Sequence, residues 1–154
     1  MKTCFFIGHH DAPESVQERL DMQVEYLVKM CGVTEFIVGY RGAFDRMATA
    51  AVQKVKRSHP EIYAYRLLCY HPYDCQVPVP EYFDNTFYPD VLYDVPRRFA
   101  IEKANRYALK ESDYLVAYVR WLGGNSGRLL AHARRLERLG SLKVINLAES
   151  EPTQ

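Results

Sequence analysis

Residues 113–140 read DYLVAYVRWLGGNSGRLLAHARRLERLG, and this stretch decides the fold class. It opens with an almost unbroken apolar run from Asp113 to Val119, which is typical of a strand buried on both faces of a sheet. A glycine-rich turn follows, and leucine and alanine then recur at the spacing of one helix face until Gly140 ends the pattern. A buried strand, a glycine turn and an amphipathic helix in this order predict one unit of a parallel α/β sheet.

The same rhythm of short apolar runs and longer amphipathic runs extends over the whole chain. We expect four helices and five strands, and the strands lie near residues 3–7, 35–39, 62–70, 113–119 and 142–147. Parallel strands need crossover connections, and these connections place helices on the faces of the sheet. The sequence therefore predicts one three-layer α/β domain over residues 1–150, with a mainly parallel five-stranded sheet and a short tail at 151–154.

Residues 70–95 interrupt this rhythm. Pro72, Pro78, Pro80 and Pro89 disfavour a long regular element there. The segment holds seven of the chain's twenty aromatic residues, more than a solvated loop tolerates, so much of it must pack. We predict a long loop insertion with three open roles: a lid over a site, a contact with another subunit, or a cover for the sheet edge.

Composition excludes several classes of protein. With 154 residues, of which 48% are hydrophobic and 25% charged, the chain suits one globular domain and is not disordered. Twenty basic against nineteen acidic residues leave a net charge of +1, so no overall field attracts nucleic acid or a membrane surface. No apolar run approaches the ~18 residues of a membrane span. We expect a cytoplasmic protein without a membrane partner, and its aromatic loop is compatible with a homo-oligomer.

The cysteines do not indicate a metal centre. Cys69, His71 and Cys75 could supply three ligands, but a closed zinc site needs a fourth and usually shows tighter paired spacing. The four cysteines form no CxxC pair, which favours reduced thiols in or near the core. We therefore predict no metal site and no cofactor.

Three loops that follow predicted strands are built alike. They are Gly8–Pro13, Gly39–Asp45 and Trp121–Gly127, and each leads into a helix. Parallel sheets bind ligands at the carboxyl ends of their strands, where glycine lets the backbone approach a ligand and free helix N–H groups attract anions. We expect an anion-binding cradle on one rim of the sheet, formed by Gly8, His9, His10, Gly39, Arg41, Gly42, Asp45, Gly123, Gly124, Asn125, Ser126, Gly127 and Arg128.

Several of these side chains have two interpretations. Asp45 could hold a ribose hydroxyl or orient His9 or Arg41, but an acidic residue is also ordinary in a first helical turn. His9 could contact a ligand or transfer protons. Arg97 and Arg98 open a helix, where cations oppose the helix dipole, so they either face an anionic ligand or pair at the surface.

The order of these motifs resembles one known family. A GHH motif follows the first strand and GxRGAxD follows the second; an Arg-Arg pair with Asn105 precedes the fourth strand, and GGNSG follows it. This order resembles the Rossmann-like SLOG superfamily, which includes the DNA-processing protein DprA/Smf, the Lonely Guy (LOG) phosphoribohydrolases and small stand-alone bacterial and phage proteins. The chain is most similar to the small stand-alone members, from about Thr3 to Leu147. The resemblance implies a Rossmann-like domain with a nucleotide or nucleotide-derived ligand.

The chain departs from the LOG hydrolases at the residues that carry their activity. Leu130 stands where their PGGxGTxxE motif has its catalytic glutamate, and only Gly42 and Met47 match their GGGxxGxMG motif. Cleavage of an N-glycosidic bond needs a carboxylate, which leucine lacks. Asp45 with His9 would have to replace it, or else Asp11 or Glu14.

Three hypotheses of function follow. The leading one is a sensor or regulatory module that binds a nucleotide or related small anionic ligand. The alternative is a nucleoside-phosphate N-glycosidase that uses Asp45 and His9. The third, single-stranded DNA binding of the DprA kind, is disfavoured by the balanced charge.

Overall fold

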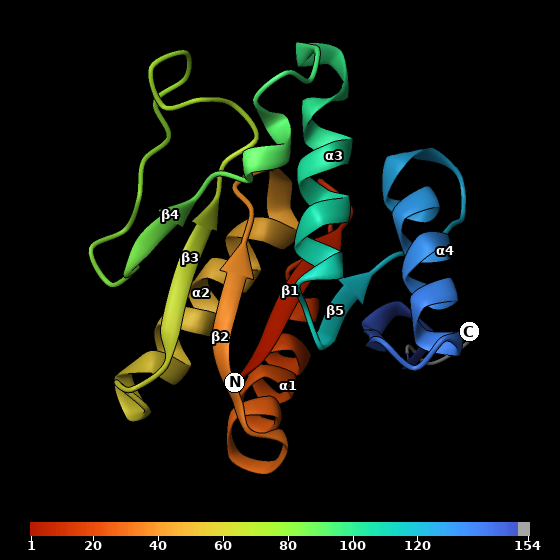
Figure 1. Ribbon diagram of the computed structural model, residues 1–154. Helices are drawn as coiled ribbons and strands as arrows, with labels where there is room; N and C mark the ends of the chain where they lie inside the picture. The colour runs from red at the N-terminus through yellow and green to blue at the C-terminus, as the bar shows by residue number, and fades with distance from the viewer. Residues whose placement is uncertain (151–154) are drawn as a thin grey trace.

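The structure, a computed structural model, describes residues 1–150, and the predicted tail at 151–154 lies outside them. Six parallel strands form one sheet in the order β4-β3-β2-β1-β5-β6 within the described residues, and four α-helices flank it (Figure 1). The elements are β1 Lys2–Gly8, α1 Val16–Cys31, β2 Val33–Val38, α2 Gly42–Ser58, β3 Tyr63–Leu67, β4 Asn85–Phe87, the short 3-10 helix η1 Asp90–Leu92, α3 Arg97–Lys110, β5 Tyr114–Tyr118, α4 Gly124–Arg138, β6 Lys143–Asn146 and the short 3-10 helix η2 Leu147–Ser150.

The sheet lies between two helical layers. Alternate residues of β1 point to opposite faces, so that Cys4 and Phe6 pack into the core with α1 and α2, while Phe5 and Ile7 pack with α3 and α4. Figure 1 shows α3 and α4 in front of the sheet and α1 and α2 behind it. The three-layer α/β fold predicted from the sequence is confirmed.

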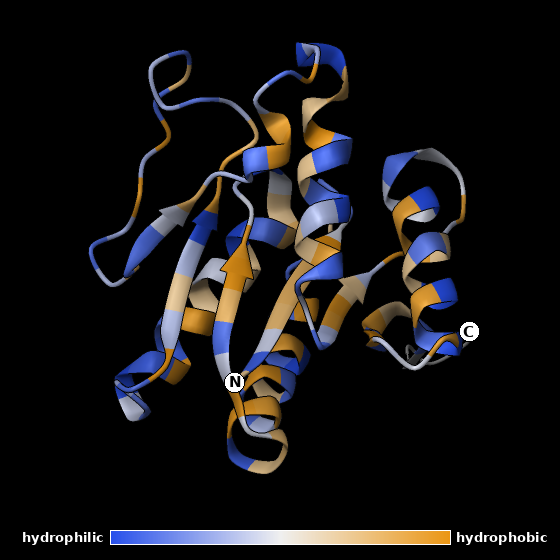
Figure 2. Cartoon of the chain, in the orientation of Figure 1, coloured by the Kyte–Doolittle hydropathy of each residue, from blue (hydrophilic) through white to orange (hydrophobic). Residues whose placement is uncertain are grey.

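The predicted number of five strands is wrong, because residues 70–95 contain the edge strand β4. Its three residues pair in parallel with β3, from Tyr65 opposite Asn85 to Leu67 opposite Phe87. A polar strand this short shows no apolar run, and Figure 2 colours it hydrophilic. The Asp84 carboxylate secures the edge by accepting the Ala64 N–H at 2.8 Å.

Most aromatic rings of the 70–95 segment pack, as predicted. Five of the seven lie in or against the two cores, whereas the other two, Tyr73 and Tyr93, are 95% and 88% exposed. Phe83 also lies under the Arg66 guanidinium, at 4.6 Å from ring centroid to Cζ. The packed rings are Tyr70, Tyr82, Phe83, Phe87 and Tyr88. Of the three open roles, a cover for the β3 edge is the one that these contacts support.

The strand order contains a topological switch point. From β1, the chain continues to β2 on one side, whereas β5 lies on the other side of β1 and leads outward to β6. The carboxyl ends of these parallel strands lie on one rim of the sheet (Figure 1). Open α/β sheets bind ligands at such a switch point, which here lies between β1 and β5. None of the helices within residues 1–150 combines the length and the apolar character needed to cross a membrane.

Candidate functional site

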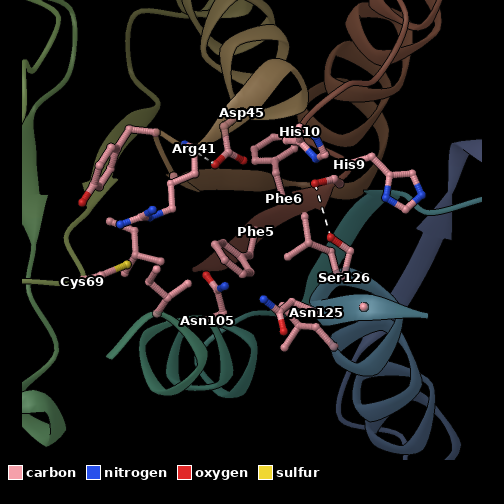
Figure 3. Close-up of a pocket in the computed structure, with 18 of the residues that line it drawn as sticks. Phe5, Phe6, His9, His10, Arg41, Asp45, Cys69, Asn105, Asn125 and Ser126 are labelled. Carbon is pink, nitrogen blue, oxygen red and sulfur yellow. Dashed lines mark hydrogen bonds between the residues drawn. The ribbon is translucent and has the colours of Figure 1, made fainter. Parts of the chain in front are cut away.

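A cavity of about 410 Å³ lies at the switch point (Figure 3). The loops after β1, β2 and β5 all contribute to it, and the α3 face and the end of β3 complete its wall. Ten of the predicted ligand residues line it: Gly8, His9, His10, Gly39, Arg41, Asp45, Gly123, Gly124, Asn125 and Ser126. Five predicted residues are not among its lining: Gly42, Arg97, Arg98, Gly127 and Arg128.

His9 is held inside the protein by both its backbone and its ring. Its backbone N–H donates to the Tyr118 carbonyl at 3.2 Å, and its Nε2 accepts the Arg120 N–H at 2.8 Å. The ring stacks on Trp121 with centroids 4.0 Å apart and planes 13° apart. Burial lowers the pKa of His9. Because Nε2 accepts a hydrogen bond, the neutral ring carries its proton on Nδ1. The ring lies away from Arg41 and Asp45 in Figure 3 and packs on Trp121 instead.

Of the three helix starts expected on this rim, α1 does not reach the cavity. The chain turns after His10, and the helix begins only at Val16, whose N–H donates to the Pro13 carbonyl at 3.0 Å. The first loop therefore contributes Gly8, His9 and His10 to the cavity lining but no helix N-terminus. The expected cradle of three helix ends is reduced to two.

The start of α2 satisfies much of its own hydrogen bonding. The Ala43 N–H donates to the His10 carbonyl at 2.8 Å, and the Arg41 N–H donates to Asp45 Oδ2 at 2.8 Å. Gly42 has φ +89, and a Cβ there would lie 2.5 Å from His10 Cα, so this glycine permits the two loops to pack closely. The Asp45 carboxylate thereby satisfies one of the N–H groups at this helix start.

Asp45 is a candidate acid of the cavity. Burial raises its pKa to about 6, against the opposing effects of the Arg41 N–H and the charges of Arg66 and Arg41. Arg66 is itself 5% exposed; its guanidinium donates to the Gly39 carbonyl and to Thr49 Oγ1, the latter at 3.2 Å. The Asp45 carboxyl group can therefore hold or release a proton near pH 6.

Arg41 supplies the positive charge of the cavity wall. Its guanidinium points toward Cys69 in Figure 3 and lies 5.7 Å from the centroid of the Tyr70 ring. Arg97, outside the cavity lining, approaches the same ring to 4.2 Å, so the two cations are joined through Tyr70. Within residues 1–150 no salt bridge neutralises Arg41 or Arg97. Arg98 lies apart, over the Phe99 ring.

The start of α4 is the open helix end at the cavity. Gly123 is the N-cap, Gly124 has φ +79, and no side chain caps the first turn in the described structure. The Ser126 hydroxyl reaches the Gly8 carbonyl at 3.5 Å and ties this turn to β1. The first N–H groups of a helix carry partial positive charge and bind phosphate or carboxylate.

Two residues predicted to bind ligand have structural contacts at α4 instead. Gly127 is buried, and a Cβ there would lie 2.1 Å from the Leu122 carbonyl oxygen, so the helix packs directly on the loop that enters it. The Arg128 guanidinium donates to Asn125 Oδ1 at the exposed surface.

The sequence did not predict Trp121, Cys69 or Tyr40 as ligand residues, and it indicated Asn105 only through the family resemblance. All four line the cavity, and the Asn105 amide points into it (Figure 3). The position of Trp121 and Cys69 just beyond β5 and β3 was the available signal. Arg66, which lies within β3, carried no such signal because its role depends on the fold.

No group of three His, Cys, Asp or Glu side chains within the described chain is arranged to hold a metal ion. No protein-family model and no curated protein matches the sequence. The fold and the cavity together define a Rossmann-like α/β protein with a cavity at the switch point of its sheet.

Proposed function

We propose that the cavity binds a nucleotide or a nucleotide-derived molecule, with a phosphate at the start of α4, and that the protein senses or sequesters this ligand. The observation that carries the proposal is the meeting of the β1, β2 and β5 loops in one cavity at an uncapped helix start. Its volume of about 410 Å³ falls within the ~300–1,000 Å³ typical of small-molecule sites.

The polar groups around the cavity match the parts of a nucleotide. The N–H groups of the α4 start suit a phosphate, and the guanidinium of Arg41 adds a cation without a salt-bridge partner in the described residues. Asp45 and Asn105 offer hydrogen bonds to sugar hydroxyls or to a base. The resemblance to the SLOG superfamily supports the same ligand class.

Binding without turnover is the favoured form of this function. Leu130, at the position of the LOG glutamate, is 4% exposed and packs in the core with α3 and α4. A buried leucine can neither activate water nor stabilise a positive sugar centre. The proposed module therefore recognises its ligand by the glycine loops at the strand ends, as the resemblance to the LOG hydrolases implies, but it lacks their catalytic glutamate.

The Arg41→Gln variant is expected to bind nucleotides at least about tenfold more weakly, since hydrogen bonds to charged groups contribute roughly 1.5–3 kcal/mol. Titration calorimetry with a panel of nucleoside mono-, di- and triphosphates and cyclic dinucleotides measures the change. Arg46→Gln is the matched control, because Arg46 lies on the exposed side of α2 and is absent from the cavity lining. Absence of binding by the unaltered protein to every member of the panel would contradict the proposed function.

A second candidate function, hydrolysis of the N-glycosidic bond of a nucleoside phosphate, is favoured by Asp45. This carboxyl group lines the cavity, and burial raises its pKa to about 6, close to the value useful for a general acid or base. If it is catalytic, chromatography should detect free base released from nucleoside monophosphates, and Asp45→Asn should reduce release by roughly a hundredfold or more. Unchanged release in Asp45→Asn, or no release by the unaltered protein, would exclude this role.

A further inference from the structure

Trp121 is an aromatic side chain that stacks on His9 and keeps about half of its surface exposed. It follows β5 directly and lines the cavity, yet it remains 51% exposed. One face stacks on His9, and His9 is itself 6% exposed and hydrogen bonded at its backbone and at Nε2. The indole therefore already rests on an ordered, buried ring before any ligand arrives.

A half-exposed aromatic ring beside a phosphate site suits a nucleobase. Stacking on an aromatic side chain needs only the flat face of a base and tolerates any base. Because the indole already stacks on His9, it loses less conformational freedom when a ligand binds, which favours binding. Trp121 precedes the glycine turn that opens α4, so one ligand can contact both the ring and the Gly124 N–H region.

We propose that Trp121 is the stacking platform for the ligand's base, so the cavity selects molecules that join an aromatic base to an anionic group. This inference rests on the proposed function and narrows its ligand class. Sugar phosphates without a base would use the anion site but gain nothing from Trp121. His9 is a positioning residue, because it acts on the ligand through Trp121.

The chain offers a direct reporter, because Trp121 is its only tryptophan. Fluorescence of the unaltered protein is measured during titration with a nucleoside 5′-monophosphate and, separately, with ribose 5-phosphate. The nucleotide is expected to quench the emission in a saturable manner and to bind at least about tenfold more tightly than ribose 5-phosphate, which leaves the emission unchanged.

Variants measured by calorimetry separate stacking from a general effect on the cavity. Trp121→Leu is expected to lose about tenfold or more in nucleotide affinity while its affinity for ribose 5-phosphate stays unchanged. Trp121→Phe keeps a ring and should retain most of the nucleotide affinity. Leu122→Ala is the matched control, because Leu122 is 75% exposed and does not line the cavity.

Two results would overturn the inference, and they are distinguishable from failure of the proposed function. Equal affinities for nucleotide and ribose 5-phosphate, or a Trp121→Leu variant with unaltered nucleotide affinity, would leave the anion site intact and remove the base platform. If neither compound binds the unaltered protein, the inference and the proposed function fail together. Neither compound would bind if the exposed Trp121 belonged instead to a surface that docks another protein.

Discussion

The Gly127→Ala variant is expected to have a free energy of unfolding about 2 kcal/mol lower than that of the unaltered protein. The added Cβ would lie 2.1 Å from the Leu122 carbonyl oxygen and 2.3 Å from its carbon, and backbone atoms cannot rotate away. Overpacking of this kind costs about 1–3 kcal/mol or more, which outweighs the gain of about 1 kcal/mol in helix propensity from alanine. Urea denaturation followed by circular dichroism measures the change.

The matched control for this variant is Gly123→Ala. A Cβ at Gly123 meets no atom within 4 Å, so the cost there is limited to the weaker N-cap, at most about 1 kcal/mol. Because Gly127 fixes the loop that carries the α4 start, Gly127→Ala should also weaken nucleotide binding. Equal stabilities of the two variants would show that α4 does not pack on Leu122 as described.

The second large effect concerns Asp45 and pH. At pH 8 the Asp45→Asn variant is expected to be more stable than the unaltered protein by up to about 3 kcal/mol, with little difference near pH 4. Burial raises the pKa of Asp45 from 3.8 to about 6, so the folded protein binds this proton more tightly than the unfolded chain. Stability from this group is therefore lost as pH rises from about 4 to about 6, and it stays low above that range. Asparagine cannot ionise and avoids the loss.

Urea denaturation of both proteins at a series of pH values between 4 and 8 tests this expectation. Asp74→Asn, in the exposed part of the 70–95 segment, controls for the removal of one carboxylate. A stability difference between Asp45→Asn and the unaltered protein that stays constant with pH would mean that Asp45 titrates alike in the folded and unfolded states. Its candidacy as an acid near neutral pH would then be lost.

The fold was predictable because the apolar residues of its core recur in the sequence at the periods of helices and strands. The buried face of α1, for example, repeats Val16, Leu20, Val24 and Leu27 at helical spacing, and Gly32 ends the helix at φ 72. The edge strand β4 escaped prediction because three residues, two of them polar, contain no period. Such a strand is specified by its contacts rather than by a pattern in its own sequence. It pairs with β3, and Asp84 just before it accepts the Ala64 N–H.

The site was predictable only in part, because one residue type serves several purposes. Glycines after strands correctly indicated the rim of the cavity, yet Gly42 and Gly127 serve close packing rather than the cavity wall. The sequence does not show whether such a glycine lines the cavity or permits close packing. Gly42 packs against His10 in another loop, and Gly127 packs against the Leu122 backbone. Trp121 was not predicted for a related reason: a single aromatic residue has no pattern, and its proposed role depends on the ring of His9 that stacks on it.

The central claim is that the uncapped start of α4 binds the phosphate of a nucleotide in the cavity. A crystal structure of the protein soaked or grown with the nucleotide that binds most tightly tests this most directly. We predict a phosphate oxygen within hydrogen-bonding distance of the N–H groups of Gly124 to Ser126, with the rest of the ligand inside the cavity. A nucleotide bound elsewhere on the protein, or a cavity that stays empty at saturating nucleotide, would contradict the account.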